Sequence, residues 1–108
     1  MTIQAFESII KTISEEFNIE FSRNQSHKAS GKRLVWKSLA KKFQYAEGEI
    51  IGKQQLGQVD YYTDDDDDTF PDLFEVRLSA NRVAVASEFS GQWDDITELN
   101  RHTWTVEF

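Results

Sequence analysis

Apolar residues recur at spacings of three and four near the start of the chain. The recurrence runs from Phe6 to Phe17, and polar side chains such as Glu7 occupy the positions between. This spacing is typical of an amphipathic helix with one apolar stripe. Thr2 precedes the stripe and carries a hydroxyl that can cap the first turn. We therefore predict a first helix over this region, followed by a short extended segment at residues 19–21.

A second apolar stripe follows a polar segment, residues 24–30, which we interpret as a loop. Ser30 can cap a helix, and basic residues lie between the apolar positions that follow it. The stripe consists of Trp36, Leu39, Ala40 and Phe43, with Val35 beside it. The spacing predicts a second helix between Ser30 and Phe43 with a basic outer face.

The rest of the chain alternates between apolar and polar positions, as β-strands do. Two short polar strands are predicted at residues 49–54 and 58–63, around a turn at Leu56 and Gly57. A clearer alternation predicts a hairpin of strands 74–78 and 83–89. Its connection is the segment 79–82.

The C-terminal part carries one more alternating segment. Residues 94–100 are predicted to form a helical turn, and residues 103–108 alternate with Trp104, Val106 and Phe108 on one face. Because helices and strands are separate along the chain, we expect an α+β fold in a single domain, residues 1–108. The specific prediction is two N-terminal amphipathic helices packed on one face of a mostly antiparallel sheet of about five strands.

Charge is segregated along this sequence. Residues 21–46 contain seven Lys or Arg and no Asp or Glu. The remaining residues carry the other five basic side chains and all nineteen acidic ones, a net charge of −14, so the whole chain has −7. Five of the acidic residues are consecutive, Asp64 to Asp68. We expect an acidic surface and one basic helix, which select partners by the sign of their charge.

Composition excludes several classes of protein. The 108 residues include no cysteine, which excludes disulfide frameworks, thiolate zinc sites and cysteine nucleophiles. The first apolar stretch is interrupted by polar residues, unlike an export signal, and no run approaches the ~20 apolar residues of a membrane span. We expect a cytoplasmic protein that does not bind membranes. The negative charge also disfavours nucleic acid as a partner.

The aspartate run admits two functional interpretations beside that of a solvated loop. It can form an acidic patch that binds a protein, or it can bind calcium, with Glu75 as the last ligand of a calcium-loop register that starts at Asp64. The register lacks glycine where the loop needs a sharp turn, because Thr69 stands there, and Pro71 follows. We therefore predict no calcium site, and we expect substitution of the run to leave the fold intact.

Other candidate chemistry is sparse. The basic residues around Trp36 could contact phosphate while the ring stacks on a base, but the stripe predicts that Trp36 is buried. His27 and His102 are far apart and lack carboxylates at fixed spacing, so they form no metal signature. We expect no metal and no cofactor, and an enzyme is the less favoured class.

The late aromatic residues Phe89, Trp93 and Trp104 lie near acidic residues in the sequence. We expect these rings to close the core. The alternative is a mixed aromatic and acidic surface, which suits a basic partner.

The profile of small size, acidity, absence of cysteine and many aromatic residues is similar to that of bacterial toxin-immunity proteins and nucleic-acid mimics, although no motif is shared. It implies a small acidic protein that neutralises or regulates a basic protein partner, as an inhibitor does. Two alternatives stay open, a carrier or enzyme with a cavity between helices and sheet, and a structural homo-oligomer subunit. The predicted protein-binding residues are Asp64, Asp65, Asp66, Asp67 and Asp68, with Asp94, Asp95 and Glu98 as a second patch.

Overall fold

A computed structural model describes residues 1–23, 32–94 and 99–108 of the chain. Its elements, in chain order, are α1 (Ile3–Glu16), β1 (Glu20–Arg23), β2 (Arg33–Ala46), β3 (Glu49–Thr63), α2 (Phe70–Ala80), β4 (Ala84–Asp94) and β5 (Leu99–Glu107). The predicted α+β class is therefore confirmed. The predicted polar loop at residues 24–30, with the Ser30 cap, lies outside the described residues.

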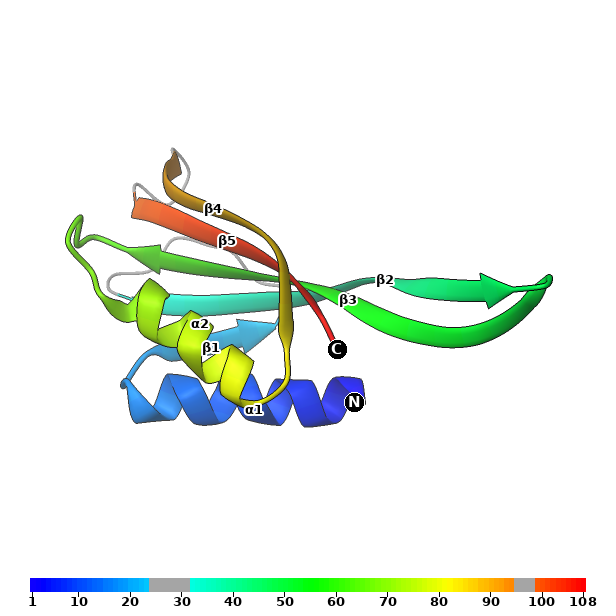
Figure 1. Ribbon diagram of the computed structural model, residues 1–108. Coiled ribbons are helices and arrows are strands. Elements are labelled where there is room, and N and C mark those ends of the chain that lie inside the picture. Colours follow the sequence, from blue (N-terminus) through cyan, green and yellow to red (C-terminus); the bar gives the residue numbers. More distant parts are fainter. Residues whose placement is uncertain (24–31, 95–98) are drawn as a thin grey trace.

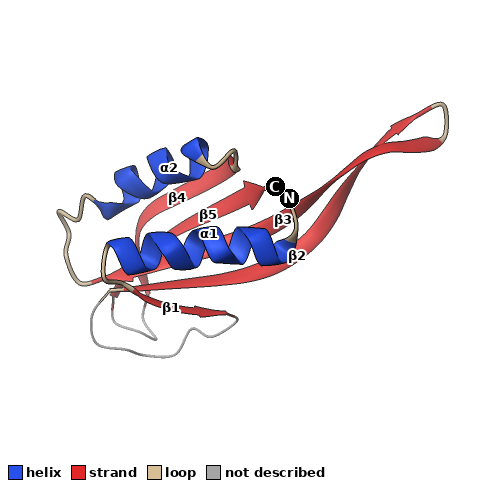
Figure 2. Ribbon diagram, turned by 90° about the horizontal axis from the view of Figure 1, so that it is seen from below, coloured by secondary structure: helices blue, strands red, loops and turns tan. Residues whose placement is uncertain are grey.

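The strands form one sheet in the order β1-β2-β3-β5-β4. The β1–β2 pair is parallel and the other neighbours are antiparallel. Both helices lie against the same face of this sheet (Figures 1 and 2). Neither helix among the described residues has the length and apolar character that crossing a membrane requires.

The first helix forms as its sequence predicts. The Thr2 hydroxyl accepts a hydrogen bond from the Ala5 N–H at 3.0 Å, which caps α1. Phe6, Ile10 and Ile13 are buried and form the stripe that packs on the sheet. The Phe6 ring meets Trp36 edge-on at 5.2 Å between centroids.

The predicted second helix between Ser30 and Phe43 is wrong, since strand β2 covers residues 33–46. The start of β2 is buried on both faces. Leu34 and Trp36 belong to the main core, whereas Val35 packs with Tyr62 and Leu99 in a separate cluster. An inner strand that is buried on both faces does not alternate between apolar and polar residues. The helix-like spacing of its apolar residues is therefore accidental, and the arrangement of two N-terminal helices is wrong with it.

The second helix lies instead at Phe70–Ala80, where residues 74–78 were expected to form a strand. Phe70, Phe74 and Leu78 are buried. They recur every four residues, so they form one helical stripe. Pro71 stands in the first turn, where a missing N–H costs no intrahelical bond.

The remaining strand predictions are confirmed only in part. Residues 49–63 form one continuous strand, so the turn at Leu56 and Gly57 is wrong. The hairpin turn lies instead at Glu47 and Gly48, whose φ angles of 53° and 80° suit a two-residue connection. The strand predicted at 103–108 is confirmed as part of β5. Asp94, Leu99 and Asn100 lie in strands rather than in the predicted helical turn, and residues 95–98 lie outside the described part.

Strands β2 and β3 extend well beyond the rest of the sheet as a two-stranded arm, which we define as residues 39–55. The arm accounts for the elongated shape, 50 × 27 × 21 Å (Figure 1). Its ladder runs from the pair Lys41–Gln55 to the pair Ala46–Glu49. No helix covers the arm (Figure 2). Its exposed large apolar side chains are Leu39, Phe43, Tyr45, Ile50 and Ile51.

Candidate protein-binding surfaces

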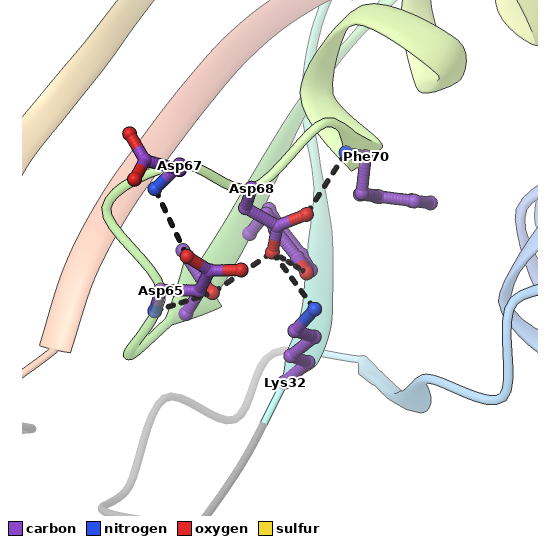
Figure 3. Close-up of polar contacts among 7 residues, drawn as sticks. Lys32, Asp65, Asp67, Asp68 and Phe70 are labelled. Atoms are coloured by element: carbon purple, nitrogen blue, oxygen red, sulfur yellow. Dashed lines mark hydrogen bonds and ion pairs between the residues drawn. The ribbon is translucent and has the colours of Figure 1, made fainter.

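The aspartate run divides into an exposed part and one buried anchor. Asp68 turns inward and accepts hydrogen bonds from the Tyr61 hydroxyl at 2.6 Å and the Thr63 hydroxyl at 2.9 Å. Its other oxygen accepts the Phe70 N–H at 2.9 Å, at the start of α2. Lys32 lies 3.3 Å from the same carboxylate (Figure 3). Asp68 therefore links β3 and α2 to Lys32, which immediately precedes β2.

These contacts change the ionisation of the groups involved. Burial acts to raise the pKa of Asp68, but hydrogen bonds from Tyr61, the Phe70 N–H, Thr63 and Lys32 together hold this pKa below its usual value. Burial and the hydrogen bond to Asp68 raise the pKa of the Tyr61 hydroxyl far above its usual value. Asp68 is therefore ionised and Tyr61 neutral near pH 7, which suits one strong hydrogen bond.

The other four aspartates form the acidic loop, which we define as residues 64–67. All four are exposed. Two backbone contacts shape the loop, from the Asp65 N–H to the Thr63 hydroxyl at 3.1 Å and from the Asp67 N–H to the Asp65 carboxylate at 2.9 Å. The Asn100 amide donates a further hydrogen bond to Asp66. The carboxylates are thus presented to solvent by a backbone with several fixed points.

The predicted second patch is only partly within the described residues. Asp94 is the last residue of β4 and pairs with Leu99, whereas Asp95 and Glu98 lie outside the described part. The neighbouring pair is Trp93–Asn100. Because Asn100 also contacts Asp66, the end of β4 and the acidic loop lie at the same end of the sheet.

The expectation that the late aromatic rings close the core is correct for one ring and wrong for two. Trp104 is fully buried, and its indole N–H donates to Glu75 at 2.9 Å. Phe89 and Trp93 are each 58% exposed. Both lie on β4, an edge strand with a neighbour on one side only, which leaves less surface for a ring to pack against. Trp93 is therefore an exposed ring near the acidic loop.

No metal site was found within residues 1–23, 32–94 and 99–108, because no three His, Asp or Glu side chains there gather to hold an ion. Asp68, a ligand position of the calcium register, is committed to Tyr61, Thr63, Phe70 and Lys32. His27 lies outside the described residues. His102 packs near Trp104, with 6.3 Å between ring centroids.

The basic residues do not form a helix face. Lys32 contacts Asp68, and Arg33 is buried with its guanidinium 5.6 Å from the centre of the Tyr62 ring. Trp36 is fully buried, as expected, so it offers no surface for base stacking. Lys41 and Lys53 lie together at the base of the arm.

A groove at the base of the arm was not predicted from the sequence. The groove has a volume of about 740 Å³ and lies where the N-terminus of α1 meets the arm. Lys41 and Lys53 line it, together with Arg23, which forms an ion pair of 3.6 Å with Glu7. Met1, Ile3 and Phe108 supply apolar lining. These residues come from distant parts of the chain, so no local motif could identify the groove.

The sequence analysis also did not predict the pair of carboxyl groups formed by Glu75 on α2 and Glu88 on β4. A hydrogen bond with Glu88 and partial burial raise the pKa of Glu75, although the Trp104 N–H opposes this. The same hydrogen bond and one from Ser90 lower the pKa of Glu88. The pair therefore links α2 to the edge strand β4.

No known family model matches the chain. A search of curated proteins found no significant sequence relative.

Proposed function

We propose that this protein is a small acidic binding protein that neutralises or regulates a basic protein partner. The proposed surface comprises the acidic loop and Trp93. The observation that carries the proposal is the contact of Asn100 with Asp66, because Asn100 is also the ladder partner of Trp93. An immunity protein against a basic toxin, or a mimic of nucleic acid, belongs to this class.

Two physical effects favour such a surface. Exposed carboxylates of one sign accelerate encounter with a basic partner, and the effect weakens as salt screens the charges. An exposed tryptophan supplies the apolar contact that anchors many interfaces. Because Asp68 and Asn100 already fix the loop, little conformational freedom is lost when a partner binds.

A carrier or enzyme with a cavity between helices and sheet receives less support. Fully buried side chains from both layers meet in that space, including Phe6, Phe74, Trp36 and Trp104. The groove of about 740 Å³ lies at the base of the arm and is lined by α1, the arm and Phe108.

The test is a pull-down from lysate of the source organism at low and moderate salt. The bait is compared with a loop variant that carries Asp64→Asn, Asp65→Asn, Asp66→Asn and Asp67→Asn. Asparagine keeps an acceptor oxygen for the loop contacts, and Asp68 is retained as the anchor. We expect a basic protein to be captured by the original chain, more strongly at low salt, and lost with the loop variant.

A control carries Glu47→Gln and Glu49→Gln, two exposed acidic residues at the tip of the arm. This control should capture the same protein as the original chain. Recovery of no basic protein at either salt concentration would count against the proposal. Equal capture by the loop variant would place the binding surface elsewhere.

A further inference from the structure

The groove at the base of the arm is basic in a protein that is otherwise acidic. Lys41 and Lys53 line it and have no ion pair among the described residues, while the third basic group, Arg23, is partly offset by Glu7. The net charge of the chain is −7. A positive groove on such a molecule is suited to an acidic occupant.

The acidic loop has the complementary charge. It joins β3 to α2 and lies at the opposite end of the molecule from the arm (Figure 1). Its exposed carboxylates have a fixed backbone, as described above. Strand β3 connects the two ends, from Glu49 in the arm to Thr63 beside the loop. One elongated chain thus carries an exposed acidic loop at one end and a basic groove at the base of the arm.

Exposed apolar groups lie on the elements beside both charged surfaces. Phe43 is paired with Lys53 in the arm, and its ring is 6.4 Å from that of Tyr45. On the other side, Leu73 and Val76 of α2 are exposed shortly after the acidic loop. A contact that buries apolar groups beside opposite charges is the usual composition of a specific interface.

We propose that the occupant of the groove is the acidic loop of a second copy of this chain. The contact joins two different surfaces, so it is heterologous, and repeated contacts build open chains of molecules unless the rotation closes a ring. The acidic loop is also the surface proposed to bind a basic partner. Self-association and partner binding therefore compete for the same loop.

The test is sedimentation velocity of the purified full chain over a range of concentrations at low and high salt. We expect the average mass to rise with concentration at low salt and to return to the monomer value at high salt. A groove variant with Lys41→Glu and Lys53→Glu should associate at least about tenfold more weakly, as should the loop variant described above. A Lys11→Glu control, on the exposed face of α1 outside the groove, should behave as the original chain.

Mixing the two variants separates this proposal from other modes of association. The groove variant retains an intact loop and the loop variant retains an intact groove, so together they can form one contact. We expect each variant to be monomeric alone and the mixture to yield dimers that grow no further. Circular dichroism verifies that each variant is folded.

Several results would overturn the inference. They are a monomeric original chain at every concentration in low salt, association that survives both variants, or a mixture that remains monomeric. Binding of a poly-aspartate peptide in the groove without self-association would also reject the second copy as occupant. None of these results depends on the lysate experiment, so the two proposals fail separately.

Discussion

The acidic loop and the arm are both exposed and both charged, yet they are attached to the molecule in different ways. The loop is fixed from beneath by Asp68, whose partners Tyr61 and Thr63 are fully buried. Beyond its base, where Lys42 contacts Glu107 and Gln55 exchanges backbone hydrogen bonds with Phe108, the arm is held by its own ladder of backbone hydrogen bonds. Tyr45 and Ile51, near its tip, are 63% and 66% exposed.

Because of this difference, we expect the loop anchor to contribute to stability and the arm to contribute to association. An isolated two-stranded hairpin is at best marginally stable in water, so the exposed apolar groups of the arm contribute little to folding. Changes at the loop anchor should therefore be costly, whereas changes at the arm should mainly affect association.

The largest effect is expected at the loop anchor. Asp68→Ala removes an ionised acceptor and leaves the buried Tyr61 hydroxyl without its partner. We expect a loss of about 3 kcal/mol in the free energy of unfolding. Urea denaturation would measure it as a lower midpoint with an unchanged slope.

The matched control is Asp67→Ala in the exposed part of the same run. Among the described residues, the Asp67 carboxylate makes no hydrogen bond or ion pair. The free energy of unfolding should therefore change by no more than about 0.5 kcal/mol. Equal losses for the two variants would contradict the division into anchor and loop. The earlier expectation that the whole run can be replaced without harm thus applies to residues 64–67 only.

Low pH should remove the stability that Asp68 contributes. The folded state lowers the pKa of Asp68 below the unfolded value of about 3.9. Its contribution to stability is therefore complete above that pH and is lost as pH falls through the folded pKa. Below about pH 4, the stability difference between the original chain and Asp68→Asn should shrink. Parallel stability curves for the two proteins down to the acid limit would contradict this assignment.

The sequence predicted what depends on local pattern and missed what depends on the neighbours. The first helix follows from its own stripe and the Thr2 cap, and the last strand follows from its alternation. Strand β2 resembled a helix because burial on two faces and exposure along the arm together removed the period of two. The apolar stripe of α2 was missed because residues 74–78 also alternate between apolar and polar positions, as a strand does.

For the candidate sites, too, local sequence showed some features and only the fold showed the others. The acidic residues were evident from their run, but the separate role of Asp68 depends on Tyr61 and Lys32, which only the fold brings to it. The exposure of Trp93 depends on β4 being an edge strand, and strand order is not encoded in local sequence. The groove forms where the start of the chain, Arg23, the arm and Phe108 meet in the fold, so it could not be predicted.

A smaller effect on stability is expected in the arm. Tyr45→Ser removes an exposed ring near the tip, and the free energy of unfolding should change by no more than about 0.5 kcal/mol. Urea denaturation measures this directly. A loss comparable to that of Asp68→Ala would mean that the arm packs against something in the isolated chain, and the contrast between the two ends would fail.

The smallest effect is expected from calcium. A cation that bound only the folded loop would raise the melting temperature as its concentration increased. We expect almost no change in millimolar calcium, because the carboxylate of Asp68 already has Tyr61, Thr63, Phe70 and Lys32 as partners and Lys32 supplies a competing positive charge. Thermal unfolding with calcium, and with magnesium as the control, measures this. A rise of several degrees specific to calcium would mean that the loop is an ion site, and its exposed carboxylates would then be ligands rather than a surface for a basic partner.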